Sequence, residues 1–417
     1  MSALTNPGEH DSDPSTTLNM STPDQTVCDS SAAEASPALE RSKDDRARGV
    51  PQAEKEVNSV REQLPQTLAL WRLPAHGDGQ RYATVMEAVW KPLYPFFRQH
   101  GYTFWKQDRG VILMPDEDDV ENIMKYSSGF AYATQHRGIG PEVGSINNIF
   151  GFESLNPLCR AARRRNGQDV VVRVLAIGDS GREHVDILKL ISMGPYAFYN
   201  DNHAIPVWDF VEFEGITFGV FPKVGFRMLE AYGYWAKNSV GDVVDMILQC
   251  LEALAFIHSL GIAHRDAFKD NFLIQWHPES LKAEHIPRSR PRVFLTDFEV
   301  AVQFSGETPT EECVLAGYPM GGSYPSDIKK YARAVPPEVT SGEPYNAFML
   351  DVWQFGKSLE DFKSTIPKID QILETLRLPD ASARLPSFYA MECLSRVVAD
   401  LSPNALMIPP ETDGPAN

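Results

Sequence analysis

The chain has 417 residues, 43% of them hydrophobic, and a formal net charge of −17 at pH 7. That length and apolar content are enough to bury the core of a two-lobed domain. The acidic balance argues against non-specific binding to nucleic acid or to an anionic membrane surface, and no apolar run approaches the ~18 residues that a membrane span needs.

The N-terminal composition and the cysteines predict an intracellular protein, in the cytoplasm or the nucleus. Residues 1–40 contain no Lys or Arg, which argues against the basic start of a secretory signal or a mitochondrial presequence. The cysteines show neither metal spacing nor a disulfide framework, as expected in a reducing compartment. They are Cys28, Cys159, Cys250, Cys313 and Cys393.

The first part of the chain is expected to be a tail followed by a packed extension. Residues 1–65 are rich in Ser, Asp, Glu, Pro and Ala, which predicts a disordered tail. The extension, 66–144, contains an apolar stripe at helical spacing that should pack on the lobe that follows. The stripe consists of Met86, Val89, Trp90, Leu93, Phe96 and Phe97. Residues 102–115 then predict a strand pair joined at Arg109-Gly110.

The next segments predict a small β-rich lobe, 145–222, and a large helical lobe, 223–405, before a disordered tail at 406–417. Residues 158–164 and 169–175 flank Asn166-Gly167 and predict a hairpin, since Asn-Gly suits a type I′ turn. A helix at 183–192 and two strands at 207–213 and 216–221 should complete the small lobe. The large lobe should begin with a helix from Ser239 to Leu260, which Gly261 ends.

The large lobe carries a pattern typical of phosphoryl transfer. Residues 264–271, HRDAFKDN, fit the loop H-R-D-x-x-x-x-N. Phosphoryl transfer needs a carboxylate at the attacking hydroxyl and an amide oxygen on the metal, which Asp266 and Asn271 would supply. A second acid, Asp297, follows the hydrophobic strand 293–295.

Two further motifs follow in order. Residues 336–338, Pro-Pro-Glu, resemble A-P-E, and residues 351–356, DVWQFG, resemble D-x-W-x-x-G. With them, the region from about 145 to 400 resembles a protein kinase domain. It most resembles the kinase-like proteins of mushroom-forming fungi, through Gly101-Tyr102 and the Asn-His-x-x-Pro step at 202–206. The resemblance implies an α+β, two-lobed protein-kinase-like fold that binds ATP and Mg²⁺ and transfers phosphate to Ser or Thr of a protein substrate.

The resemblance also implies roles for individual residues. Asp266 would orient the acceptor hydroxyl, with Lys269 and Arg265 as further catalytic-loop residues. Asn271 and Asp297 would hold Mg²⁺. The positions expected to bind the nucleotide are Gly151 in the phosphate loop, Val171 and Leu273 around adenine, and Arg173 at the phosphates. His264, Phe298 and Leu188 would stack in a hydrophobic column between the lobes.

Several positions depart from the family pattern. Arg173 stands where kinases place a lysine, and a guanidinium fork does not mimic a compact ammonium. His184 occupies the position of the glutamate that pairs with that lysine. Two positions of the phosphate loop read Glu153 and Asn156 instead of glycine. Glu299 replaces the glycine of D-F-G and is expected to be a solvated or locally hydrogen-bonded carboxylate, with a third metal ligand as the alternative.

Three functions are compatible with these residues. The first is an ATP-dependent Ser/Thr protein kinase that is weak or atypical. The second is a pseudokinase, a binding or scaffolding module that kept the acids of the large lobe but lost its grip on phosphates. The third is a small-molecule kinase of the aminoglycoside-phosphotransferase type, which the Pro-Pro-Glu and D-x-W-x-x-G segments disfavour.

One long-range contact can also be predicted. Glu338 should form a buried ion pair with Arg384, which lies in a segment similar to the Arg-Pro-Ser/Thr step where kinases keep this partner. Arginine suits the role because its fork grips a carboxylate bidentately. Residues 277–292, which are rich in His, Pro, Arg and Ser, should be a surface insertion.

Overall fold

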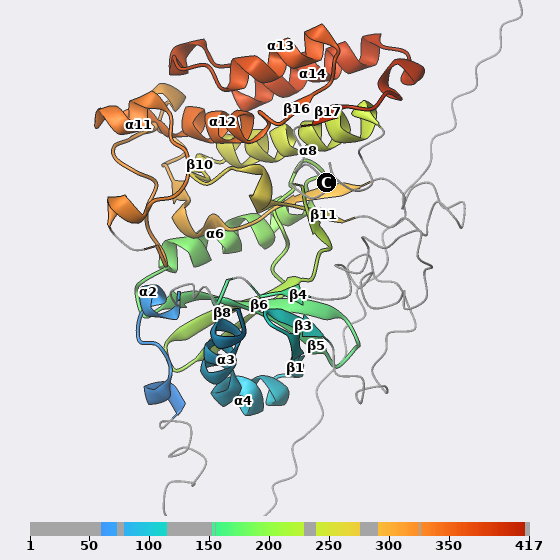
Figure 1. The fold of residues 1–417 in the computed structure, drawn as a ribbon. Helices are drawn as coiled ribbons and strands as arrows, with labels where there is room; N and C mark the ends of the chain where they lie inside the picture. Colours follow the sequence, from blue (N-terminus) through green and yellow to red (C-terminus); the bar gives the residue numbers. More distant parts are fainter. Residues whose placement is uncertain are drawn as a thin grey trace, which may run out of the picture. The chain divides into compact units, whose positions relative to one another are not determined.

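The fold consists of a small lobe around a five-stranded sheet and a large lobe built mainly of helices (Figure 1). A computed structural model describes residues 60–72, 79–114, 152–154, 156–228, 239–275, 291–324 and 327–412, which all fall in the unit Gln52–Asn417. The predicted α+β, two-lobed fold is confirmed. In the described ranges, no helix is long and apolar enough to cross a membrane.

The central sheet of the small lobe is antiparallel, in the order β1-β5-β6-β8-β7. The predicted hairpin is present, but its turn is not type I′, because Gly167 (φ +82°) takes a left-handed conformation and Asn166 does not. The strands are β1 (Tyr102–Phe104), β5 (Cys159–Arg164), β6 (Asp169–Ile177), β7 (Asp209–Phe213) and β8 (Ile216–Pro222).

The two faces of strand β6 serve different cores because successive side chains point to opposite sides of a sheet. Val170, Val172 and Val174 pack in the small-lobe core with the N-terminal extension. On the other face, Leu175 joins helix α6 (Arg182–Ser192) in the core of the large lobe. Arg173 shares this second face, so the alternation of β6 directs it toward the large lobe.

The N-terminal extension packs on the sheet through its aromatic side chains. Its helices are α2 (Leu68–Trp71), α3 (Gly79–Trp90) and α4 (Tyr94–Gln99), with a 3-10 turn (Lys91–Leu93) between the last two. Trp71 and Phe97 both meet Phe218 edge-on, with ring centroids 6.2 and 5.1 Å apart. Leu64 is also buried in this core, so packing begins inside the segment predicted to be a disordered tail.

The segment at 102–115 differs in part from the prediction. Its hairpin, β2 (Lys106–Arg109) and β3 (Ile112–Met114), turns at Gly110 and joins β4 (Phe152–Glu153) in a separate three-stranded sheet. β1 pairs with β5 instead. The two sheets separate here because Phe104 and Trp105 enter different hydrophobic clusters.

The large lobe is organised around helix α8 (Val240–Ser259), which follows the prediction closely. The side chain of Ser239 caps it by accepting from the Asp242 amide at 3.1 Å, and Gly261 (φ +71°) follows its end. The other helices are α11 (Pro337–Ser341), α12 (Ala347–Ser358), α13 (Pro367–Leu376) and α14 (Ser387–Asp400).

Short strands complete the large lobe. The C-terminal β17 (Glu411–Thr412) pairs with β16 (Phe362–Lys363), so the prediction of disorder throughout 406–417 is wrong for this stretch. The insertion at 277–292 lies almost wholly outside the described residues. The remaining strands are β9 (Phe226–Arg227), β10 (Ile262–Ala263), β11 (Phe272–Gln275), β12 (Arg292–Leu295), β13 (Val302–Gln303), β14 (Val314–Leu315) and β15 (Tyr345–Asn346).

The predicted ion pair between Glu338 and Arg384 is present and bidentate. The two nitrogen–oxygen distances are 2.5 and 3.0 Å, and the Arg384 side chain is fully buried. Arg384 also donates to the carbonyl of Met349 in α12. The pair therefore joins α11, which carries Glu338, to α12 in the large lobe.

Replacing Glu338 by alanine should destabilise the protein by about 3–5 kcal/mol, because it leaves Arg384 buried and unpaired. Glu392→Ala is the matched control: it breaks the exposed Glu392–Arg396 pair and should cost at most about 0.5 kcal/mol. Thermal and denaturant unfolding measure both effects. Equal stability of the two variants would contradict the structural role of the buried pair.

Candidate active site

The candidate catalytic loop is held by helix α12. Asp351, which is fully buried, accepts hydrogen bonds from the amides of His264 and Arg265 at 2.7 and 2.6 Å. Gln354 accepts from the amide of Ala267 at 2.9 Å and donates to the carbonyl of Arg265 at 2.8 Å. Two positions of the D-x-W-x-x-G segment thus fix the backbone of the H-R-D segment.

Asp266 is buried and carries an amide and a guanidinium on its carboxylate. Asn271 donates to Asp266 Oδ2 at 2.8 Å. Arg333 lies 3.3 Å from Oδ1 through Nε and also donates to Asp270 at 2.8 Å. Burial raises the pKa of Asp266, and the Arg333 charge partly offsets that rise. The predicted pair of Asp266 and Asn271 is therefore brought together, with an arginine that the sequence did not indicate.

The other two predicted catalytic-loop residues point to structural partners. The Lys269 ammonium bonds to the carboxylate of Asp361. Arg265 donates to the carbonyls of Val300 at 3.1 Å and Tyr318 at 3.4 Å. In this structure, then, the Lys269 side chain is directed to Asp361, and Arg265 holds the backbone of the segment 300–318.

Asp297 follows strand β12 in a left-handed conformation (φ +69°). The preceding Thr296 donates its amide to the carbonyl of Asn271 at 3.0 Å, which ties the two proposed metal-binding positions to adjoining backbone. Phe298 is buried against His264, with ring centroids 4.9 Å apart, and shares a hydrophobic core with Leu188. The contact between His264 and Phe298 is present, and the stacking of Leu188 on it stays a prediction.

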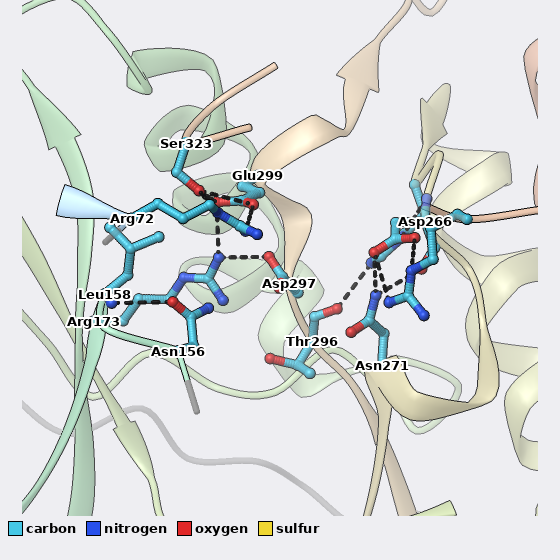
Figure 2. Close-up of polar contacts among 12 residues, drawn as sticks. Arg72, Asn156, Leu158, Arg173, Asp266, Asn271, Thr296, Asp297, Glu299 and Ser323 are labelled. Carbon is cyan, nitrogen blue, oxygen red and sulfur yellow. Dashed lines mark hydrogen bonds and ion pairs between the residues drawn. The ribbon is translucent and has the colours of Figure 1, made fainter. Parts of the chain in front are cut away.

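Arg173, Asp297, Glu299 and Arg72 form a continuous network of charges (Figure 2). Arg173 Nη2 lies 2.6 Å from Asp297 and 3.1 Å from Glu299. Arg72, from the N-terminal extension, donates to the other oxygen of Glu299 at 2.8 Å. The Glu299 side chain is only 6% exposed, so of its two expected environments the solvated one is excluded. The carboxylate is instead hydrogen-bonded, to Arg72, Arg173 and Ser323, and these donors let it be buried.

The charges of the network act on its acids in opposite directions. Burial alone would raise the pKa of Asp297, but the charge and hydrogen bond of Arg173 outweigh burial and lower it. Burial and the neighbouring Asp297 charge raise the pKa of Glu299, against the effect of the two arginines. Asp297 therefore holds the negative charge of the pair more firmly than Glu299 does.

His184 lies near enough to Arg173 for that charge to act on its imidazole, but it does not neutralise Arg173. Burial, followed by the nearby Arg173 charge, lowers the pKa of His184 to about 3. The neighbouring Glu183 is exposed on α6. Arg173 consequently takes its carboxylate partners from the segment after β12 and not from α6.

The remaining predicted positions divide between the lobes. Val171 is half-buried on β6, opposite Phe221 of β8. Leu273 lies on β11 and packs partly buried against the core of the large lobe. Gly151 lies outside the described residues, while Glu153 is exposed on β4. Over the part of the chain that is described, no group of three or more His, Cys, Asp or Glu side chains is placed to hold a metal.

Sequence reasoning missed Arg72, Arg333, Ser323 and Asp361. Arg72 directly follows the short helix α2 and has no motif around it. Arg333 lies three residues before the Pro-Pro-Glu segment, which is the one available hint that it would lie near the site. An isolated charge in a sequence has many candidate partners, so its actual partner emerges only from the fold.

Comparison with known proteins finds partial sequence similarity to Ser/Thr protein kinases. No protein-family model matches the chain. It is similar to the serine/threonine-protein kinase PAK mbt of Drosophila melanogaster, with 25% identity over 209 residues, 50% of this chain and 28% of that protein. It is also similar to a Dictyostelium discoideum protein named "probable inactive serine/threonine-protein kinase", with 31% identity over 114 residues, 27% of this chain and 7% of that protein.

Among solved structures, the kinase domain of Rad53 aligns with a TM-score of 0.38 and 18% identity, over 59% of this chain and 85% of that one. The matched region spans less than a third of the length of either curated relative. Over part of its length, the chain is thus similar to distant Ser/Thr protein kinases.

The buried neutral His184 makes stability depend on pH. Below its ordinary pKa of 6.5 the unfolded chain protonates this imidazole and the folded protein does not, so the unfolded state binds more protons. Stability should fall as pH decreases from about 6.5 toward 3, by at most ~1.4 kcal/mol per pH unit from this group. His184→Asn should flatten the dependence in denaturant unfolding at several pH values; identical slopes would contradict the assignment.

Proposed function

We propose that this domain binds ATP and Mg²⁺ and transfers phosphate to Ser or Thr of a protein substrate. The observation that carries the proposal is the hydrogen-bonded unit of Asp266 and Asn271, joined through Thr296 to Asp297. Those are an acceptor-orienting carboxylate and two oxygen ligands, the groups that phosphoryl transfer requires.

The ligand atoms of the site suit Mg²⁺ and a polyphosphate. Asn271 bonds to Asp266 through its amide nitrogen, so its amide oxygen is directed away and can serve as a metal ligand. Mg²⁺ is commonly held by one or two such protein oxygens together with phosphates and water. Arg173 Nε is buried and has no hydrogen-bond partner among the described residues, and a phosphate oxygen would satisfy it.

The side of the site where the acceptor would bind also has a polar atom without a hydrogen-bond partner among the described residues. Asp266 Oδ1 is buried without a hydrogen bond within the described chain, although the Arg333 guanidinium lies at 3.3 Å. A serine or threonine hydroxyl could donate to this oxygen. Asp266 would then orient the hydroxyl and accept its proton as the phosphoryl group is transferred.

The second candidate is a pseudokinase that binds or scaffolds without transferring phosphate. Its support is that the cations of the site are already paired within the protein. Arg173 pairs with Asp297 and Glu299, and Arg333 pairs with Asp266 and Asp270. The name of the Dictyostelium relative, a "probable inactive" kinase, is consistent with this candidate. We prefer phosphotransfer over this second candidate because the acceptor-orienting acid and both oxygen ligands are retained together.

Finer assignments belong to the same proposal. They are a kinship with the kinase-like proteins of mushroom-forming fungi, a protein substrate or binding partner, and action in the cytoplasm or nucleus. The domain boundaries at 145–222 and 223–405, and the nucleotide-binding role of Gly151, Val171 and Leu273, are likewise proposed from the sequence pattern.

Asp266→Asn should reduce phosphotransfer by about 10²-fold or more, because a general base contributes at least that much. Mg²⁺-ATP affinity should stay within about threefold, since Asp266 contacts the acceptor and not the phosphates. Asp297→Asn should instead abolish the Mg²⁺ dependence of ATP binding. Calorimetry and transfer from labelled ATP measure the two properties.

Equal phosphotransfer by the wild type and Asp266→Asn would identify the activity as a contaminant. ATP binding without transfer would favour the second candidate. Glu392→Ala, remote on α14, serves as the control that should change neither property.

The position of His184 near Arg173 permits a repair of the small lobe. Arg173→Lys with His184→Glu would recreate a lysine–glutamate pair and relieve Asp297 of its arginine. Mg²⁺-ATP should bind more tightly to the double variant than the two single effects predict, by about 1 kcal/mol of coupling. Strictly additive effects would show that the two side chains do not interact; Glu183→Gln, on the exposed face of α6, is the control.

A further inference from the structure

Arg72 lies outside the two lobes by sequence and yet contacts the centre of the candidate site. Its Nη2 donates to Glu299 at 2.8 Å, and its Nε donates to Ser323 Oγ at 2.8 Å. Its guanidinium lies over the ring of Tyr324, 3.8 Å from the centroid. Three separate contacts therefore fix this one cation. Figure 2 shows Arg72 beside Glu299 and Ser323.

The backbone of Arg72 is also anchored. Helix α2, which it follows, buries Leu68 and Trp71 in the core of the small lobe. The Trp71 indole donates to the carbonyl of Pro157 at 3.1 Å. Arg72 is thus held on a fixed support, and it bonds to the Glu299 oxygen that is not bonded to Arg173.

Arg173 is shared between the carboxylates of Asp297 and Glu299. To bind phosphates, it has to leave both, and each carboxylate would then need another partner. Mg²⁺ would replace Arg173 at Asp297, since Asp297 is a proposed metal ligand. Glu299 gains no such replacement and depends on Arg72 and on Ser323, whose hydroxyl lies 2.9 and 3.2 Å from its oxygens. Among the described residues, Glu299 forms ion pairs with Arg72 and Arg173. Without Arg72, it would therefore be left with Arg173 alone.

We propose that Arg72 is a positioning residue of the nucleotide site: it holds Glu299, so that Arg173 is free to bind the phosphates of a nucleotide. The inference rests on the proposed function and adds that the N-terminal extension is part of the site. Arg72 itself touches no phosphate.

The test compares Mg²⁺-ATP affinity in the full chain across Arg72→Met, Arg72→Lys, Glu299→Gln and the double variant Arg72→Met/Glu299→Gln. Arg72→Met should weaken binding at least tenfold, and Arg72→Lys should weaken it less. Glu299→Gln removes the charge that captures Arg173, so the double variant should bind within threefold of Glu299→Gln alone. Arg182→Met, which breaks an exposed pair with Asp179, should change nothing.

Adenosine provides the readout that separates positioning from general damage, because it lacks phosphates. Its affinity should be the same in the wild type and Arg72→Met, whereas a misfolded site would weaken both ligands. Failure of Glu299→Gln to rescue Arg72→Met would overturn the inference, since it would mean that Arg72 contacts the phosphates directly. Wild-type protein that binds no Mg²⁺-ATP would overturn the proposed function and the inference together; wild-type binding that Arg72→Met leaves unchanged would overturn the inference alone.

Discussion

The buried carboxylate of Asp351 is the interaction on which the large lobe depends. Besides the amides of His264 and Arg265, it bonds to the His258 imidazole of α8 at 2.9 Å. That imidazole in turn bonds to Ser387 of α14 at 3.0 Å. A carboxylate can be buried only where donors replace the water it loses, and here the donors come from the loop that carries Asp266. The backbone amides that replace the water lost by Asp351 are therefore the same amides whose position sets the geometry of the candidate site.

Much of the large lobe could be predicted because its contacts join motifs. The residues that form the loop, the helix beneath it and the Glu338–Arg384 pair each sit in a recognisable pattern, so the pattern implies the partner. Helix α8 was predictable for a local reason, since its apolar face, its serine cap and its terminal glycine all lie within one stretch of sequence.

The contacts that could not be predicted join residues without a pattern. Arg72 and Glu299 are separated by 227 positions, and Arg333 and Asp266 by 67. The sequence supplies each of these charges with many alternative partners. The packing of the extension on the sheet decides the partner of Arg72, and the packing of the large lobe decides that of Arg333. Strand β17 escaped prediction for a related reason: two residues carry too little periodicity to identify a strand.

Two departures from the kinase pattern compensate each other. Arg173 and Glu299 are each a defect when considered alone, because one replaces a compact ammonium and the other puts a carboxylate where glycine is expected. In the structure they are partners, and Arg72 supplies the second cation that balances Asp297 and Glu299. The two pairs of opposite charge sum to zero, which is the condition for keeping them out of water.

This balance also determines what kind of ligand the site can accept. Removing one partner of a buried ion pair is costly, on the order of 3–5 kcal/mol, whereas exchanging both partners for equivalent charges need not be. A metal ion alone would satisfy Asp297 but leave Arg173 to Glu299, and a phosphate alone would satisfy Arg173 but leave Asp297 unpaired beside new negative charge. A ligand that brings a cation and an anion together exchanges both partners at once. Under the proposed function, the network would couple the binding of the metal to the binding of the phosphates, and by linkage each would strengthen the other to the same extent.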